Sequence, residues 1–286
     1  MNVELIDSVE EFIALTTSFR AADPLRTNVI GSVALAVSTG RTIYDGCHWW
    51  IVRDGDRHVV GVAMRTGPFN MVVPPMPVDA ARALGRSVAM LDDTLPGVTG
   101  SASVLDALIE GYVESQSRGS TRTPRERRRD LLYELEDLVT PDVEGFGRPA
   151  RAEEIVAVAM MYVEFNREID HPALSLADAL VGVNKSVGAG SIFCWEVSGD
   201  IVAIAGHAPV VTTESTVIAR VGPVFTPAQC RRQGYGSAVT AHVTRHLLER
   251  GARVMLFTDA ANPTSNGIYQ EIGYRLVDEL IELELE

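Results

Sequence analysis

The stretch that decides the fold is VGPVFTPAQCRRQGYGSAVTAHVTRHLL, residues 221–248. An apolar run that predicts a strand over 216–226 leads into a turn, and Gly234 and Gly236 then open a predicted helix over 236–250. The start of a helix leaves several backbone N–H groups without partners, and these groups lie at the positive end of the helix dipole. Because glycine lets a ligand approach the backbone closely, the stretch predicts a site for an anion such as a pyrophosphate.

The distribution of charge supports this prediction. The whole chain has 286 residues and a net charge of −13, yet residues 216–250 contain five arginines and one glutamate, a net charge of +4. Arg231 and Arg232 would add fixed positive charge at the lip of the anion site. The alternative is an ordinary strand–turn–helix connection in which the glycines only allow a tight turn. Neither a P-loop motif nor the third glycine of a dinucleotide motif is present, since position 239 is Val.

Composition excludes several broad classes of protein. A net charge of −13 argues against a general nucleic-acid binder, which needs a basic surface, and mildly favours cationic small-molecule partners. Cys47, Cys194 and Cys230 lie far apart and form neither a disulfide framework nor a zinc pattern. The N-terminal stretch lacks the features of a signal peptide, and no apolar run approaches the ~20 residues of a membrane span. We therefore expect a cytoplasmic protein without a membrane partner, either a monomer or a homodimer.

One pattern occurs twice along the chain. Residues 50–64 read WIVRDGDRHVVGVAM and residues 195–206 read WEVSGDIVAIAG, each an apolar strand, a Gly-Asp turn and a second apolar strand. The two predicted hairpins are separated by about half of the chain, and similar elements follow each of them. We infer a tandem duplication of one α/β unit, with domains at 1–140 and 150–286 separated by TPDVEGFGRP, residues 140–149. Two unrelated hairpins are the alternative.

The pattern of apolar residues predicts the elements of each half. In the first half we expect strands at 3–6, 70–73 and 131–139, helices at 8–20, 79–91 and 101–117, and a hairpin at 49–65; residues 117–129 are polar and basic and are expected to be an exposed loop or linker. In the second half we expect helices at 152–168 and 265–272, a hairpin at 192–209, and strands at 254–258 and 274–284.

Two segments of the second half resemble one known family. The run RRQGYG, residues 231–236, resembles the R/Q-x-x-G-x-G/A motif of the GNAT superfamily of N-acetyltransferases. The run ANPTSNGIYQEIGYRLV, residues 261–277, is similar to the N-x-x-S-N-x-x-Y-x-x-x-G-F/Y segment of that family. The resemblance covers about residues 150–286, and it departs from the family pattern at Ala228, where a second proline or a P-x-x-R spacing is common. It implies an α/β protein with a mixed sheet, namely two GNAT-like domains in tandem with the acyl-CoA N-acyltransferase fold.

The resemblance also implies a role for each part of the site. The pyrophosphate of coenzyme A would lie on the backbone amides of Arg232, Gln233, Gly234, Tyr235, Gly236 and Ser237. Backbone groups of Val224 and Thr226 would pair with the pantetheine arm, and an N–H near Phe225 would stabilise the oxyanion. Asn262 and Asn266 would contact the arm or shape the turn.

Tyr269 is the residue that the resemblance implies as general acid. A thiol with a pKa near 8.5 leaves more readily when a donor protonates it, and a tyrosine with a pKa near 10 can deliver that proton in a dry site. The alternative is that Tyr269 only packs as an aromatic on a short helix.

The general base that accepts the amine proton is less well defined. His207 ends the second hairpin and has a suitable unperturbed pKa near 6.5, although a structural histidine is an open alternative. Glu196, Glu164 and Asp170 are further candidates. Cys230 beside the turn would allow an acyl-cysteine, but direct transfer is the usual route of the family. His242 and His246 have an i, i+4 spacing without an evident third ligand, so we expect no metal.

The first half lacks the glycine motif of the second half. After residues 70–73 it has Pro74, Pro75 and Pro77, which cannot donate N–H groups, so we expect a degenerate copy that does not bind coenzyme A in the usual way. The cluster His48-Trp49-Trp50 is expected to be buried core, with substrate recognition as the alternative.

These observations predict an enzyme with two substrates. The expected reaction is transfer of an acetyl group from acetyl-CoA to a small primary amine by direct attack in a ternary complex. The alternatives are a non-catalytic acyl-CoA sensor or partner-binding module and, less favoured by residues 231–236, a purely structural α/β protein.

Overall fold

The computed structural model describes residues 1–91, 95–115, 122–169 and 173–285. The first half of the chain forms β1 (Asn2–Ile6), α1 (Val9–Leu15), α2 (Thr17–Ala22), α3 (Asn28–Ser38), β2 (Cys47–Arg53), β3 (Val59–Thr66), β4 (Met71–Val73), α4 (Val78–Leu91), β5 (Gly97–Gly100), α5 (Ala102–Ser115) and β6 (Pro124–Leu135). The second half forms β7 (Phe146–Pro149), α6 (Ile155–Glu168), α7 (Leu176–Gly188), β8 (Ile192–Val197), β9 (Asp200–His207), β10 (Val211–Thr212), β11 (Val217–Phe225), α8 (Tyr235–Leu248), β12 (Ala252–Asp259), α9 (Pro263–Glu271) and β13 (Tyr274–Leu285).

The order of elements in the first half recurs in the second. Each half has a strand, helices, a hairpin, a strand, a helix, a strand, a helix and a final strand, and the second half adds the short β10. The predicted hairpins are β2–β3 and β8–β9, each antiparallel. The structure therefore supports the repeat that the two hairpin sequences indicated, while the domain limits 1–140 and 150–286 stay predictions.

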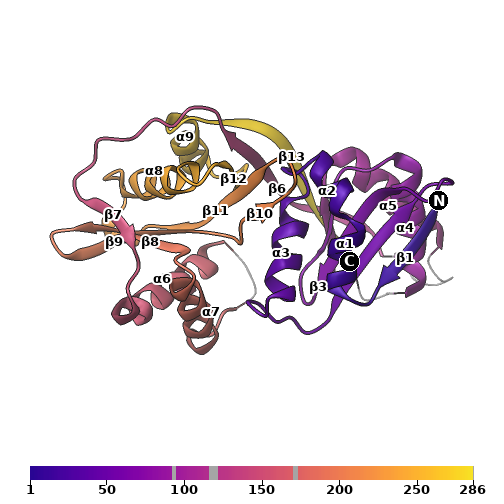
Figure 1. Cartoon of the computed structure of the whole chain (residues 1–286), viewed down its shortest axis with the longest axis horizontal. Coiled ribbons are helices and arrows are strands. Elements are labelled where there is room, and N and C mark those ends of the chain that lie inside the picture. The colour runs from indigo at the N-terminus through magenta and orange to yellow at the C-terminus, as the bar shows by residue number, and fades with distance from the viewer. Residues whose placement is uncertain (92–94, 116–121, 170–172, 286) are drawn as a thin grey trace.

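All strands join one mixed sheet with helices on both faces (Figure 1). The order is β1–β2–β3–β4–β5–β13–β6–β12–β11–β9–β8–β7, and β10 pairs with β11. In the second half, α8 and α9 cover one face and α6 and α7 the other (Figure 1). In the first half, α1 and α3 cover one face and α4 and α5 the other. This is the predicted α/β class with a mixed sheet.

The cores follow the period of two that a strand buried on both faces imposes. On β2, Trp49 packs with the helices α1 and α3, while the adjacent Trp50 packs with α4 and α5. On β8, Phe193 packs toward α8 and Cys194 toward α6 and α7. Both tryptophans are 1% exposed, which confirms the expected core role for them. The expectation is wrong for His48, which is exposed because its position near the start of β2 lies at the edge of the packed layers.

The predicted helix over 8–20 is wrong as a single element. Ser8 caps α1, accepting a hydrogen bond from the Glu11 amide at 3.2 Å, but α1 ends at Leu15, and α2 starts at Thr17. Between them, Thr16 departs from helical geometry (ψ 3°), and its amide and hydroxyl both donate to the Phe12 carbonyl.

The predicted loop over 117–129 is also corrected where the chain is described. Residues 124–129 belong to β6, the strand ends at Leu135 rather than at Val139, and residues 117–121 lie outside the described residues. The partner of β6 is β13, in an antiparallel ladder from Leu135↔Tyr274 to Pro124↔Leu285. The basic end of β6 thus lies beside acids of β13, which makes a polar strand stable.

β6 and β13 are each shared by both halves. The last part of β6 pairs with β12 of the second half, and the last part of β13 pairs with β5 of the first half. The C-terminal end of the chain accordingly lies in the first half (Figure 1). No helix within the described ranges is long and apolar enough to cross a membrane.

The shared strands predict that the two halves unfold together. Leu132 on β6 is fully buried with Leu25, Ile218 and Met255, so Leu132→Ala should lower the free energy of unfolding by about 2–5 kcal/mol. Two variants separate the fluorescence signals of the halves. One keeps Trp195 alone and reports on the second half, and the other keeps Trp49 and Trp50 and reports on the first. Urea titrations followed by tryptophan fluorescence should give coincident midpoints that Leu132→Ala shifts equally.

The matched control is Leu276→Ala on β13, where the side chain is 51% exposed and the expected change is within about 0.5 kcal/mol. Separate midpoints for the two tryptophan probes would contradict the shared-strand prediction.

Candidate active site

The central feature of the second half is the point where β11 and β12 stop pairing. Their parallel ladder runs from Val217↔Ala252 to Val221↔Leu256, although β11 continues to Phe225. On its other side β11 pairs with β9 through an irregular register between Val221 and Val224. Backbone groups of β11 beyond Val221 therefore face β12 without a ladder. We call this place, where β11 beyond Val221 and β12 beyond Leu256 no longer pair, the notch.

The turn after β11 exposes backbone N–H groups beside the notch. Gly234 has φ +81° and Arg232 has φ +65°, so the chain turns through two left-handed residues before α8. The first helical bond runs from the Ala238 amide to the Gly234 carbonyl at 3.0 Å. The amides of residues 232–237 precede that bond, and none has a hydrogen-bond partner among the described residues. We call these six amides the cradle.

Gly236 brings the cradle close to the end of β11. A side chain at this position would begin 3.2 Å from the Thr226 hydroxyl, so only a glycine leaves this approach free. Tyr235 is buried under the cradle, and its hydroxyl donates to the Gln233 side chain at 3.0 Å. The Ser237 hydroxyl donates to the Gly234 carbonyl at 2.8 Å.

The two arginines at the lip behave differently. Arg231 makes an ion pair with Glu168 at the end of α6 at 2.5 Å, and its Nε donates to the Thr226 carbonyl at 2.9 Å. Its guanidinium also lies 5.8 Å from the centre of the Phe225 ring. Arg232 is exposed and makes no ion pair with the described residues. Arg231 thus orders the turn, and Arg232 is the cation left for a ligand.

The segment that links the halves contacts the cradle. A Cβ atom on Gly234 would lie 2.8 Å from Cγ2 of Val143. This segment is held in place because the Trp195 indole donates to the Glu144 carbonyl at 2.8 Å. Nothing in the sequence pattern indicated this contact, since 140–149 reads only as a linker.

Tyr269 is buried on α9, with 9% of its surface exposed. Its ring packs edge-on against Tyr274 at 6.3 Å. The Tyr274 hydroxyl pairs with Thr244 at 2.7 Å, whereas the Tyr269 hydroxyl has no hydrogen-bond partner among the described residues. Burial alone raises the pKa of Tyr269 to about 12, so the phenol is protonated at neutral pH and is free to donate to a ligand.

Asn262 and Asn266 both shape the turn before α9. The Asn262 side chain accepts from the Ser265 amide at 3.0 Å and caps the helix. The Asn266 side chain donates to the Asp259 carbonyl at 3.1 Å, and its Oδ1 is buried without a partner.

His207 lies at the end of β9, opposite Val221 where the β11–β12 ladder ends. Its Nδ1 is 2.8 Å from the Ala208 carbonyl, and burial lowers its pKa, so the ring is neutral at pH 7. The ring packs 6.4 Å from Phe193, which also lies 4.6 Å from His246. His207 therefore faces α8, among core side chains.

The other candidate bases differ in their surroundings. Glu196 is paired with Arg148 at 2.6 Å, Glu164 is exposed on α6, and Asp170 lies outside the described residues. Cys230 is a free, partly buried cysteine beside the cradle. Within the described ranges, the group with metal-ligand spacing is Asp54, Asp56 and His58 on an exposed turn, remote in sequence from the notch, and it does not include His242 or His246.

The first half has no corresponding notch in its described residues. β4 pairs with β5 along its whole length, from Met71↔Val98 to Val73↔Gly100. The prolines at 74, 75 and 77 follow directly, and α4 begins at Val78.

Comparisons with known proteins agree with this geometry. Residues 197–281 match the family model described as FR47-like protein. No curated protein sequence matches the chain. A GNAT-family acetyltransferase from Colwellia psychrerythraea is similar in structure, with a TM-score of 0.66, 12% identity and full coverage of both chains. A GCN5-related N-acetyltransferase from Sphaerobacter thermophilus has a TM-score of 0.62 and 14% identity, covering 99% of this chain and 95% of its own.

The protein therefore has the GNAT acyl-CoA N-acyltransferase fold. Over nearly its full length, it is also similar to a tandem GNAT protein from the clavulanic acid biosynthesis pathway. That similarity has a TM-score of 0.59 and 12% identity, with 99% of this chain and 98% of the other covered.

The contact between Gly234 and Val143 gives a prediction about stability. Gly234→Ala should lower the free energy of unfolding by about 1–2 kcal/mol, because the backbone at this position is left-handed. The clash of the new methyl group with Val143 should lower it further. Gly251→Ala is the matched control, because Gly251 has φ +75° and open space around it, so only the backbone penalty applies. Urea unfolding should show the larger loss for Gly234→Ala.

A double-mutant cycle isolates the steric part of that loss. Val143→Ala combined with Gly234→Ala should recover part of the lost stability relative to the sum of the single changes. Strict additivity of the two changes would show that Val143 does not restrict the cradle.

Proposed function

We propose that the protein is an N-acetyltransferase that moves an acetyl group from acetyl-CoA to a small primary amine by direct attack in a ternary complex. The observation that carries the proposal is the position of the cradle beside the notch, where free amides adjoin an unpaired strand edge. A pyrophosphate binds to free backbone amides, and an arm that contains amide groups pairs with an unpaired strand edge. The GNAT fold supports acyl-CoA-dependent acetyl transfer in general.

The donor would lie along β11 in this proposal. The amides of residues 232–237 hold the pyrophosphate, with Arg232 as the free cation at the lip. Backbone groups of Val224 and Thr226 pair with the pantetheine arm as an added strand. An N–H near Phe225 stabilises negative charge on the thioester oxygen during attack. Asn262 and Asn266 support the arm indirectly, because they fix the turn before α9.

Tyr269 acts as the general acid. The amine nitrogen attacks the thioester carbon, the carbon–sulfur bond breaks, and the departing thiolate takes the phenolic proton. The proposal is supported by the unpartnered hydroxyl of Tyr269 and by a pKa near 12 that keeps the proton in place. The amine proton passes to a base, for which we retain His207, whose ring packs toward α8, and Glu164, which is exposed on α6 on the opposite face of the sheet.

The first half has a structural role in this proposal. It lacks a notch in its described residues, so we assign acyl-CoA binding to the second half alone. We retain the expectation of a monomer or homodimer in the cytoplasm.

Acetyl-CoA should raise the thermal unfolding midpoint of the protein. At 100 times its dissociation constant, a ligand adds about 2.7 kcal/mol to the free energy of unfolding. Gly234→Asp puts a carboxylate and a Cβ atom into the cradle and should abolish the shift. Gly251→Asp, at a glycine with a similar φ but open surroundings, should retain it. Absence of a shift and of calorimetric binding in the unmodified protein would refute the proposed donor.

Tyr269→Phe should lower kcat by about 10²–10⁴-fold, because the leaving thiolate loses its proton donor. The affinity for acetyl-CoA should change little. Tyr274→Phe is the matched control, since it removes a neighbouring buried hydroxyl that is bonded to Thr244. With a pKa near 12, Tyr269 should cause no fall in kcat between pH 6 and 10. Unchanged kcat in Tyr269→Phe would reject the acid role, and binding without turnover of any amine would favour the sensor.

A further inference from the structure

Two arginines between the halves are partly buried and have no carboxylate partner among the described residues. Arg220 on β11 donates to two side chains of α3, from Nε to Asn28 Oδ1 and from Nη2 to Ser32 Oγ, each at 3.2 Å. Arg41, in the loop after α3, donates to Ser191 Oγ at 2.5 Å. All three acceptors are neutral. Burial lowers the pKa of both guanidinium groups, which Tyr162 and, for Arg220, Tyr44 oppose only in part, and no described carboxylate contributes. An uncompensated buried charge is costly, so a ligand with the opposite charge would be stabilising here.

A tyrosine connects the two arginines. Tyr162 on α6 lies close enough to Arg41 and Arg220 that both cations oppose the upward shift that burial causes in its pKa. Its hydroxyl has no hydrogen-bond partner among the described residues. Beside Arg220, the Asn28 side chain is 1% exposed, and its Nδ2 donor is buried without a partner. Donors therefore outnumber acceptors around Arg220.

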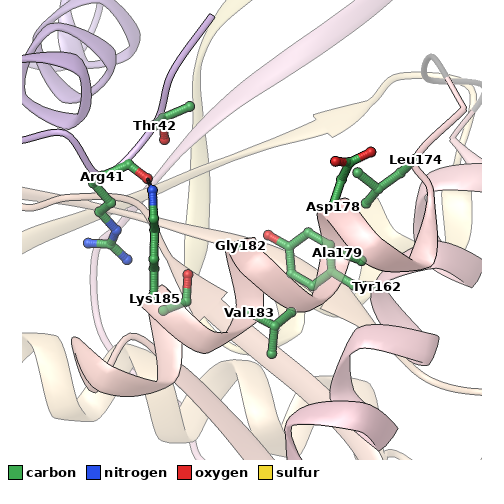
Figure 2. Close-up of a pocket in the computed structure, with 10 residues that line it drawn as sticks. Arg41, Thr42, Tyr162, Leu174, Asp178, Ala179, Gly182, Val183 and Lys185 are labelled. Atoms are coloured by element: carbon green, nitrogen blue, oxygen red, sulfur yellow. Dashed lines mark hydrogen bonds between the residues drawn. The ribbon is translucent and has the colours of Figure 1, made fainter.

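A cavity of about 210 Å³ opens beside this cluster. Figure 2 shows Arg41 and Lys185 at one end, Tyr162 along the floor, and Asp178 with Leu174 at the other end. Lys185 donates to the carbonyls of Gly40 at 3.2 Å and Arg41 at 3.1 Å, which fixes the loop that carries Arg41. The end of the cavity near Arg41 is thus cationic. We call this cavity the interhalf pocket; Arg220 does not line it but interacts with Tyr162, which does.

The interhalf pocket lies on the face of the sheet that α6 and α7 cover, because Tyr162 of α6 and several residues of α7 line it. Arg220 immediately precedes Val221, where the β11–β12 ladder ends, whereas the cradle follows β11 at residues 232–237. A row of aromatic rings links the pocket to the end of β11: Tyr162 to Phe165 at 6.3 Å, and Phe165 to Phe225 at 6.4 Å. The pocket and the end of β11 are therefore connected by packed side chains on the face that α6 and α7 cover.

We propose that the interhalf pocket binds the oxyanion of the acceptor, so that the acceptor carries a carboxylate or phosphate group as well as the amine. This inference rests on the proposed function. An oxyanion would offer acceptors to Arg41 and the Tyr162 hydroxyl, which line the pocket, and would gain a longer-range attraction from Arg220 beside Tyr162. Guanidinium groups match carboxylate and phosphate geometry. Anchoring that end of the acceptor leaves the amine free to reach the notch.

The first test measures anion binding without a donor. Calorimetry with inorganic phosphate and with glutarate, at constant ionic strength, is performed on the full-length protein, on Arg41→Gln and on Arg167→Gln. Arg167 is exposed on α6, the helix that carries Tyr162, so its loss removes the same charge outside the pocket. We expect saturable binding that Arg41→Gln weakens by roughly 10- to 100-fold, the effect of losing a charged hydrogen bond, and that Arg167→Gln retains.

The two probes identify the kind of oxyanion. Tighter binding of glutarate indicates a carboxylate acceptor and tighter binding of phosphate indicates a phosphate acceptor. Phosphate bound in the cradle would have the same affinity for all three proteins. It would therefore not explain a weaker affinity of the Arg41→Gln variant. Equal binding by the unmodified protein and Arg41→Gln, or no binding of either probe, would overturn the proposal.

The second test compares matched amines in acetyl transfer. The pairs are 4-aminobutyrate with butylamine, and phosphoethanolamine with ethanolamine, so each pair differs by the oxyanion. The anionic member should have the higher kcat/KM by about tenfold or more, and Arg41→Gln should remove that preference through KM. Equal values within both pairs would reject the acceptor role even if acetyl-CoA binds. Failure of acetyl-CoA to bind would instead reject the proposed function, whatever the anion data show.

Discussion

The pairing of β6 with β13 is the interaction on which the rest of the structure depends. Arg127 and Arg128 on β6 lie 3.5 and 4.0 Å from Glu282 of β13, and Arg129 lies 3.7 Å from Glu279. These are partly exposed pairs, so their value lies in specifying register more than in stability. The ladder joins the halves into one sheet, because the two ends of each strand contact different halves.

The same pairing also defines the notch. Beyond Leu256, the residues Phe257 and Thr258 of β12 pair with Leu132 and Leu131 of β6, so β12 stays in the sheet after its ladder with β11 has ended. β6 also supports α9, since the Gln270 side chain next to Tyr269 donates to the Tyr133 hydroxyl at 3.0 Å. A strand of the first half thus positions the proposed acid of the second.

The sequence predicts those features of the structure that depend on residues close together in the chain, and it misses those that depend on distant ones. The strand, turn and helix around Gly234, the two hairpins and the position of Tyr269 follow from short-range patterns and from the family motifs. β6 was mistaken in part for a loop because PRERRR has no apolar alternation, and its stability comes from acids about 150 residues away. The partner of Arg231, the Val143 contact and the acid-free setting of Arg41 and Arg220 likewise arise from long-range packing. The position of His207 at the end of a strand follows from the local pattern, but the packing of its ring toward α8 depends on the fold.

Net charge gives little information about the acceptor, for a related reason. A charge of −13 suggested cationic partners, but most of those acids are surface groups whose fields fade over a Debye length of about 8 Å at physiological salt. Arg41 and Arg220 are partly buried and have no carboxylate partner among the described residues, so their charges are screened less than those of the surface acids. An acceptor whose amine attacks in its neutral form gains little from surface acids, whereas its oxyanion would gain directly from the buried arginines. The local, desolvated charges therefore carry more information about the substrate than the sum over the chain.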